Sequence, residues 1–271
     1  MDSHIVAGSC ICDDMLTALH HRDDPHCHLT DAESMTVAIG AALFFGGNNA
    51  RAQAQLVEHH YLATALSARR FNRRLQRSTA LVLTLFALLG AHWKARNAEC
   101  VDVIASFRSA SCDNIRIKRS RRYQGEADRG SGPSKRRYCS GLRVHLLVTA
   151  NGEPGEVFLL PGADNDTGAL QWYQFDLPPG ATIIGDNACN HSRREDDLAA
   201  VGLTLAPLRK KNAKRAIPAW ATYWRQQVRQ SMETVGSLLS DRFPNTIRAG
   251  SAAGFELKIG LFVLAYSIDC L

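Results

Sequence analysis

The pattern of apolar residues changes near residue 100, and this change limits the folds that the chain can adopt. Before it, apolar residues recur at helical spacing in segments such as 31–45 and 67–78. After it come short runs rich in β-branched residues, at 101–107, 143–149, 156–160, 181–186 and 203–208. Helical segments are expected between the later runs, and again at 223–239 and 255–271. This order predicts an α/β fold with a mixed sheet flanked by helices and preceded by an all-helical region.

The same change suggests two domains, a helical one at residues 1–97 and an α/β one at 98–271. In the first, Asp31 is expected to cap a helix that ends at Gly46–Asn49, after which a short helix begins. The basic helix at 67–78 follows, so this region resembles a helix-turn-helix arrangement that would bind DNA. Its arginines share one face of the helix. The same arrangement is also expected of a solvated helix face that binds no ligand.

The net charge of +6 and the sequence pI of about 9.0 favour a polyanionic partner, and the basic residues are clustered. The residues expected to contact DNA phosphates are Arg70, Arg73, Arg74, Arg77, Arg116, Lys118, Arg119, Arg121, Arg122, Lys135, Arg136, Arg137, Arg209, Lys210, Lys211, Lys214 and Arg215. Aromatic residues near these clusters either stack on unpaired bases or pack in the core. They are Tyr123, Tyr138, Trp220, Tyr223 and Trp224, and we expect packing for at least half of them.

The eight cysteines are scattered and do not form the framework of a small secreted domain, which favours reduced thiols and a cytoplasmic location. The start of the chain lacks a secretory signal pattern. The apolar stretches at 36–45 and 80–89 are shorter than a membrane span, so no membrane partner is expected.

One N-terminal group of metal-binding side chains deserves a separate test. Cys10 and Cys12 are followed by His20, His21, His26, Cys27 and His28, and all of these residue types are zinc ligands in other settings. Their spacing does not match the paired ligands of a structural zinc site, so we expect a polar loop and cysteines packed on a helix.

Two carboxylates stand where phosphoryl-transfer enzymes hold metal ions. Asp186 closes a buried apolar run, and Glu233 lies in a later helix. Carboxylates on such elements bind pairs of divalent ions. A strand-end Asp also caps turns, however, and a helical Glu is usually solvated, so neither residue decides the function alone.

A resemblance to a known family supports a catalytic role for both residues. Segments across nearly the whole chain resemble, in order, the signatures of the insertion-sequence transposase family numbered nine hundred and eighty-two. They begin at Leu66, Cys112, Ser134, Gly141, Phe158, Gly185, Arg209, Glu233 and Gly254. The resemblance implies a bacterial DDE transposase with an RNase H-like sheet. It also implies Mg²⁺ or Mn²⁺ as cofactor, double-stranded DNA (terminal inverted repeats and target DNA) as partner, and a homo-oligomeric active complex.

Carried over residue by residue, the resemblance makes Asp186 the second Asp of the triad, Glu233 the Glu, and Arg229 the arginine that accompanies it. The strand that should read Val-Ile-Asp-Ser-Phe reads Val-Ile-Ala-Ser-Phe, so Ala105 stands in place of the first catalytic Asp. Asp102 should face the opposite side of the strand, and Asp113 belongs to another segment, so neither is expected to substitute.

The sequence therefore predicts a transposase whose cleavage and strand transfer are impaired at position 105. A DNA-binding relic that does no chemistry is the alternative. An RNase H-like nuclease unrelated to transposition would share the carboxylates but would not explain the order of the motifs.

Overall fold

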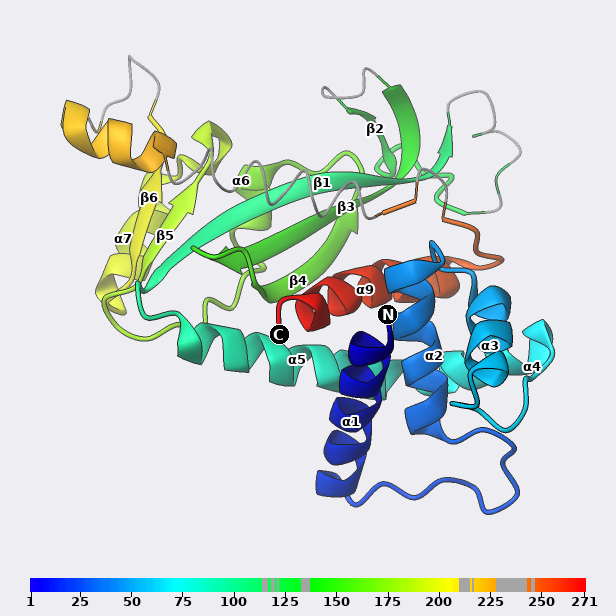
Figure 1. The fold of residues 1–271 in the computed structure, drawn as a ribbon. Helices are drawn as coiled ribbons and strands as arrows, with labels where there is room; N and C mark the ends of the chain where they lie inside the picture. The colour runs from blue at the N-terminus through cyan, green and yellow to red at the C-terminus, as the bar shows by residue number, and fades with distance from the viewer. Residues whose placement is uncertain are drawn as a thin grey trace. The chain divides into compact units, whose positions relative to one another are not determined.

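The computed structural model describes residues 1–113, 117, 120, 122–132, 137–209, 215, 217–227, 243–244 and 247–271. Contacts divide the chain into two compact units, which are described separately below (Figure 1). The first unit combines Met1–Leu89 with Arg242–Leu271, and the second is Gly90–Asp241. By its contacts, the closing helix thus groups with the N-terminal helices, whereas the expected division at residue 97 assigned it to the sheet domain. The division into a DNA-binding and a catalytic domain stays a prediction.

The first unit is helical. Its elements are α1 (Asp2–Ala18), α2 (Asp31–Phe44), α3 (Asn49–Glu58), α4 (Ala68–Arg77), the larger part of α5 (Thr79–Arg96) and α9 (Ala252–Asp269). Helix α2 contacts α1, α3, α4 and α9. A helix with neighbours on several sides must be apolar around most of its circumference, and α2 is buried continuously from Ser34 to Ala42.

The ends of α2 follow from local chemistry. Thr30 Oγ1 accepts a hydrogen bond from the backbone N–H of Glu33 at 3.1 Å, and a Glu33 carboxylate oxygen accepts one from the N–H of Thr30 at 2.7 Å. The expectation that Asp31 caps this helix is therefore wrong, because this reciprocal capping box makes Thr30 the N-cap. At the other end Gly46 and Gly47 adopt φ of 55° and 78°, a left-handed conformation that glycine tolerates, and the helix stops as expected.

The described part of the second unit contains six strands in one mixed sheet. They are β1 (Val101–Asp113), β2 (Arg129–Gly132), β3 (Arg137–Thr149), β4 (Pro154–Pro161), β5 (Thr182–Gly185) and β6 (Thr204–Pro207). β3 runs antiparallel to β1, and both β4 and β2 pair antiparallel with β3. On its other edge β1 pairs parallel with β5, which pairs parallel with β6 (Figure 1). The prediction of a mixed α/β sheet is confirmed.

Short helices connect the strands that follow β4. They are α6 (Asp166–Ala169), the 3₁₀ turn η2 (Asn187–Cys189) and α7 (Ser192–Ala200), and residues 219–227 are also helical. A core on one face of the sheet joins Ile104, Leu147, Ile183 and Leu205 to Leu198 of α7 and to aromatic residues that follow α6. The face of β1 that carries Ile104 is therefore the face that the connections cover.

Among the described helices, none is by itself long and apolar enough to cross a membrane. α4 and α5 reach that length and hydropathy only as a pair, and they are bent by 56° where they meet.

Candidate functional site

Asp186 lies at the carboxyl end of β5. The strand ends at Gly185, where a Cβ atom would lie 2.6 Å from the Cβ of Cys189, so only glycine allows the chain to turn back this closely. Asp186 itself is half-buried and extended, with φ of −69° and ψ of 172°. Its carboxylate accepts a hydrogen bond from the N–H of Asn187 and caps η2. The strand-end position expected from the sequence is confirmed, while its role as a metal ligand stays a prediction.

The strand register brings position 105 to Asp186. β1 and β5 pair Asp102 with Ile183 and Val103 with Ile184. Continuing this parallel register by two residues sets Ala105 beside Asp186, on strands that lie about 4.8 Å apart. Residues at matched positions of parallel neighbours point to the same face, so a carboxylate at position 105 would lie next to that of Asp186. Ala105 is half-buried and offers no ligand atom.

Asp102 does not replace the missing carboxylate. Side chains alternate along a strand, so Asp102 and Ala105, three residues apart, point to opposite faces. Asp102 is only 1% exposed, and burial raises the pKa of its carboxyl to about 6, although the charge of Lys94 partly opposes this shift. Asp113 is the last residue of β1, which at about 3.3 Å per residue puts it roughly 25 Å from Ala105.

The other two predicted members of the site, Glu233 and Arg229, lie outside the described residues. Within the described part, the register places a single carboxylate, that of Asp186, beside position 105. A pair of divalent ions needs several carboxylates in reach. The described residues alone do not supply the carboxylates of a two-metal centre, and the assignment of a lost ligand to position 105 stays a prediction.

One polar cluster, on the face of the sheet opposite to the side chain of Ala105, was not predicted. Ser106 Oγ donates to Asp166 Oδ1 at 2.7 Å, and Arg143 Nη2 donates to Asp166 Oδ2 at 2.8 Å. His145, fully buried, stacks on Phe158 with ring centroids 5.1 Å apart. These contacts tie α6 to β1 and β3. A lone arginine in an apolar alternating strand was the sequence signal for this cluster, but its partner lies 23 residues away.

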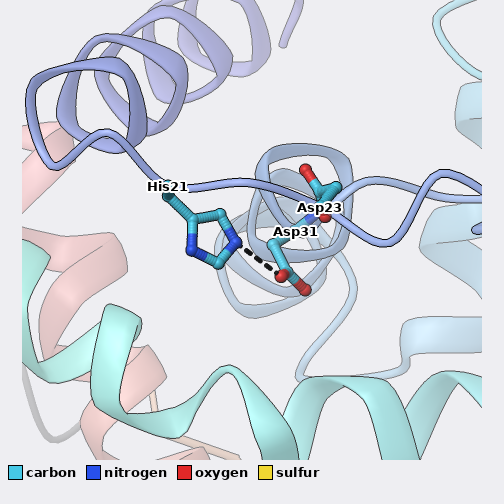
Figure 2. A group of neighbouring side chains, drawn as sticks. All are labelled: His21, Asp23 and Asp31. Atoms are coloured by element: carbon cyan, nitrogen blue, oxygen red, sulfur yellow. Dashed lines mark hydrogen bonds and ion pairs between the residues drawn. The ribbon is translucent and has the colours of Figure 1, made fainter.

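A second cluster, in the first unit, has the composition of a metal site. His21, Asp23 and Asp31 bring one ligand atom each within 4.8 Å of one another (Figure 2). Their oxygens are already occupied: Arg74 Nη2 lies 2.6 Å from Asp23 Oδ1 and 3.2 Å from Asp31 Oδ1, and His21 Nε2 lies 3.0 Å from Asp31 Oδ2. The arginine supplies the positive charge that a metal ion would supply.

The protonation of Asp31 fits this interpretation. Burial raises the pKa of its carboxyl, but hydrogen bonds from Ser78 and His21 and the charge of Arg74 outweigh burial and lower the pKa below its ordinary value. The cluster therefore joins the loop before α2 to α4 as an ionic contact. The four residues Cys10, Cys12, His26 and His28 do not form a candidate metal-binding group among the described residues.

The arginines of α4 divide into two kinds. Arg70, Arg73 and Arg77 are exposed, opposite the buried Phe71 and Leu75. Arg74, in contrast, is half-buried and paired with Asp23 and Asp31. It is therefore less available to a phosphate than the other three arginines. The amphipathic helix is confirmed, and the contact with DNA stays a prediction.

The predicted basic residues of the second unit are only partly described. Arg209 binds Glu195 through two contacts, Nη1 to Oε1 at 2.9 Å and Nη2 to Oε2 at 2.5 Å, and Arg215 contacts Glu195 and Asp196. Burial raises the pKa of Glu195, yet the hydrogen bond and charge of Arg209 lower it below its ordinary value. Arg122 is half-buried, and only the backbone of Arg137 is described. The remainder lie outside the described residues: Arg116, Lys118, Arg119, Arg121, Lys135, Arg136, Lys210, Lys211 and Lys214.

Four of the five aromatic residues near the basic clusters are exposed. Tyr138, Trp220, Tyr223 and Trp224 have exposed fractions of 46%, 73%, 65% and 41%. The expectation that at least half of them pack in the core is therefore wrong. Sequence could not distinguish the two outcomes, because the same aromatic spacing suits a buried or an open helix face.

Comparisons with known proteins add little to this geometry. No family model matches the chain, and no curated protein matches it. Among solved structures, the chain is similar to the piggyBac transposase in a cryo-EM structure of its synaptic complex with hairpin DNA. The two are 12% identical, the match covers all of this chain and 73% of the other, and the TM-score is 0.45. A likeness at this level carries no conclusion about fold or activity.

Proposed function

We propose that this chain is a DNA transposase of the DDE class whose cleavage and strand transfer are impaired because Ala105 replaces the first catalytic aspartate. The observation that carries the proposal is the register of β1 and β5, which, when continued two residues beyond the last pair, puts position 105 beside Asp186. In this class, two aspartates on adjacent strands share divalent ions. The motif order of the sequence, resembling the insertion-sequence family numbered nine hundred and eighty-two, supports the same conclusion.

The topology supports an RNase H-like sheet. β4, β3 and β1 are antiparallel neighbours, and β5 and β6 continue the sheet in parallel on the other edge of β1. Helices occupy the connections that follow β4. In a sheet of this order β1 and β5 lie side by side, so carboxylates at matched positions of the two strands would be neighbours.

When bound, Mg²⁺ or Mn²⁺ would polarise the phosphate and activate the attacking oxygen. Asp186 would hold the ion from β5, and Glu233 would complete the ligands from the later helix. Arg229, one helical turn before Glu233, would orient that carboxylate or contact a phosphate. With alanine at position 105 the ligand set is incomplete, and we derive no cleavage step for the chain as it stands.

The activity that remains is DNA binding. The exposed arginines of α4 and the basic stretches of the second unit would contact the phosphates of the terminal inverted repeats, in a homo-oligomeric complex in the bacterial cytoplasm. A second candidate, a relic that binds DNA without any cleavage, is favoured by the same alanine. The two differ in whether restoring the carboxylate restores cleavage.

The test compares the chain with its Ala105→Asp variant on DNA that carries the ends of its own element, in Mg²⁺ and in Mn²⁺. We expect cleavage by the variant and at most traces by the natural chain, because a missing metal ligand costs several orders of magnitude in rate. Ala105→Asn is the matched control, equal in size but uncharged, and Ala105→Asp with Asp186→Asn should be inactive. Robust cleavage by the natural chain would refute the assignment of position 105, and silence of all variants would favour the relic.

A further inference from the structure

The helix at residues 219–227 presents an aromatic face, which we define as Trp220, Tyr223 and Trp224. Their spacing of three and four residues places them on one side of the helix. Their exposed fractions are 73%, 65% and 41%. The opposite side, with Ala221 at 8% exposed and Arg225 half-buried, packs against the second unit. Large aromatic side chains are normally buried, so three exposed on one helical turn mark a binding surface.

The helix that carries the aromatic face is attached, through its opposite side, to the strand edge that carries Asp186. Arg225 Nη1 donates to the carbonyl of Pro207, the last residue of β6, at 3.0 Å. The N–H of Leu208 donates to the carbonyl of Gly185, the last residue of β5, at 3.0 Å. Since Asp186 follows Gly185 directly, the helix is fastened to the edge where the candidate site is built.

Charge identifies the occupant. Between Leu198 and Met232 the chain contains no Asp or Glu. Its charged residues there are all basic, although two of them, Arg209 and Arg215, are already paired with Glu195 and Asp196. The others are Lys210, Lys211, Lys214, Arg225 and Arg229. A purely apolar partner would have no need of this charge. A nucleic-acid strand offers both features, a phosphate backbone for the cations and ring faces for the aromatics.

We infer that the aromatic face binds the unpaired bases of a DNA strand next to the candidate site. The inference rests on the proposed function and deepens it, because a duplex keeps its ring faces stacked inside, whereas a single-stranded or opened end exposes them. Stacking is tolerant of sequence, since every base has a flat face. The second unit thus contacts an opened end of DNA, and the exposed arginines of α4 contact duplex.

The experiment measures binding of the full chain to a labelled thymidine oligonucleotide of about 20 nucleotides, longer than the sites of about 4–16 nucleotides typical of such surfaces. A duplex of equal length serves as the second ligand. The variant is Trp220→Ala with Trp224→Ala. The matched control is Trp172→Ala, because Trp172 is 60% exposed in the same unit but lies far along the chain from the aromatic face. The replaced side chains are exposed, and circular dichroism checks that each variant is folded.

We expect the double variant to bind the oligonucleotide at least tenfold more weakly, and the duplex less than threefold more weakly, while Trp172→Ala binds both as the natural chain does. Trp220→Phe with Trp224→Phe should retain most of the affinity, since an aromatic ring remains.

Three results would overturn the inference. Unchanged oligonucleotide binding by the double variant, with duplex binding intact, would reject the aromatic face and leave the proposed function standing. An altered particle mass in light scattering, without a change in DNA affinity, would assign the face to a second copy of the chain. Failure of the natural chain to bind either DNA would remove the proposed function together with the inference.

Discussion

At the scale of single residues, the candidate site depends on one methyl group. Ala105 occupies a position that the strand register sets beside Asp186, and the nearest acid along the strand, Asp102, is turned to the other face. The β-sheet alternation that orients a catalytic carboxylate also prevents a neighbour three residues away from taking its place.

Asp102 is expected to make the stability of the protein depend on pH. Asp102 is 1% exposed, and burial raises the pKa of its carboxyl from 3.8 to about 6, although the charge of Lys94 and a hydrogen bond with Asn97 partly oppose this shift. The unfolded chain therefore releases this proton at lower pH than the folded chain does. Between about pH 4 and pH 6, the contribution of Asp102 to the free energy of unfolding should fall by about 3 kcal/mol as the pH rises.

Asp102→Asn should abolish this loss, so urea denaturation at pH 4 and pH 7 should show the variant gaining about 3 kcal/mol relative to the natural chain as pH rises. The comparison between the two chains is needed because burial lowers the pKa of His145 to about 4, which acts on stability in the opposite direction and cancels in the difference. If the free energies of unfolding of the two chains changed equally with pH, the buried carboxyl with a raised pKa at Asp102 would be rejected.

At the scale of elements, α4 is held to the loop before α2 by Arg74. Arg74→Ala should lower the free energy of unfolding by about 1–3 kcal/mol, because it leaves the half-buried carboxylates of Asp23 and Asp31 without their cation. Arg73→Ala is the matched control, one residue away on the exposed side, and should change stability by less than about 0.5 kcal/mol. Equal effects of the two substitutions in thermal or urea unfolding would contradict the ionic contact.

Element positions were predictable where side-chain pattern decides them. The apolar runs at 181–186 and 203–208 correspond to β5 and β6. The β3–β4 hairpin turns at Asn151–Gly152, a residue pair typical of hairpin turns, and Gly152 adopts φ of 96° there. β2 was not predicted, because its Arg-Gly-Ser-Gly sequence has no apolar alternation and its strand form comes from pairing with β3.

Contacts between distant segments were not predictable. The pairing of Arg74 with Asp23 joins residues 51 apart, and that of Arg209 with Glu195 crosses from a strand end to a helix. Charge clusters in a sequence therefore overstate the cations available to a ligand. The strand-end position of Asp186, in contrast, follows from local pattern alone.

At the scale of the whole molecule, the account predicts a DNA affinity dominated by phosphate contacts. The logarithm of the association constant should fall linearly with the logarithm of salt concentration. Replacing Arg70, Arg73 and Arg77 together by alanine should reduce the magnitude of that slope by up to about 2.7, at about 0.9 for each phosphate contact on duplex DNA. A slope near zero for the natural chain would exclude a phosphate-dominated interface.

The central claim, that position 105 completes a metal site with Asp186, can be tested without any DNA. Calorimetric titration with Mn²⁺ compares the natural chain, Ala105→Asp, and Ala105→Asp combined with Asp186→Asn. We predict that Ala105→Asp binds Mn²⁺ at least tenfold more tightly than the natural chain, because a second carboxylate joins the first, and that Asp186→Asn removes the gain. Equal Mn²⁺ affinity of all three chains would contradict the claim.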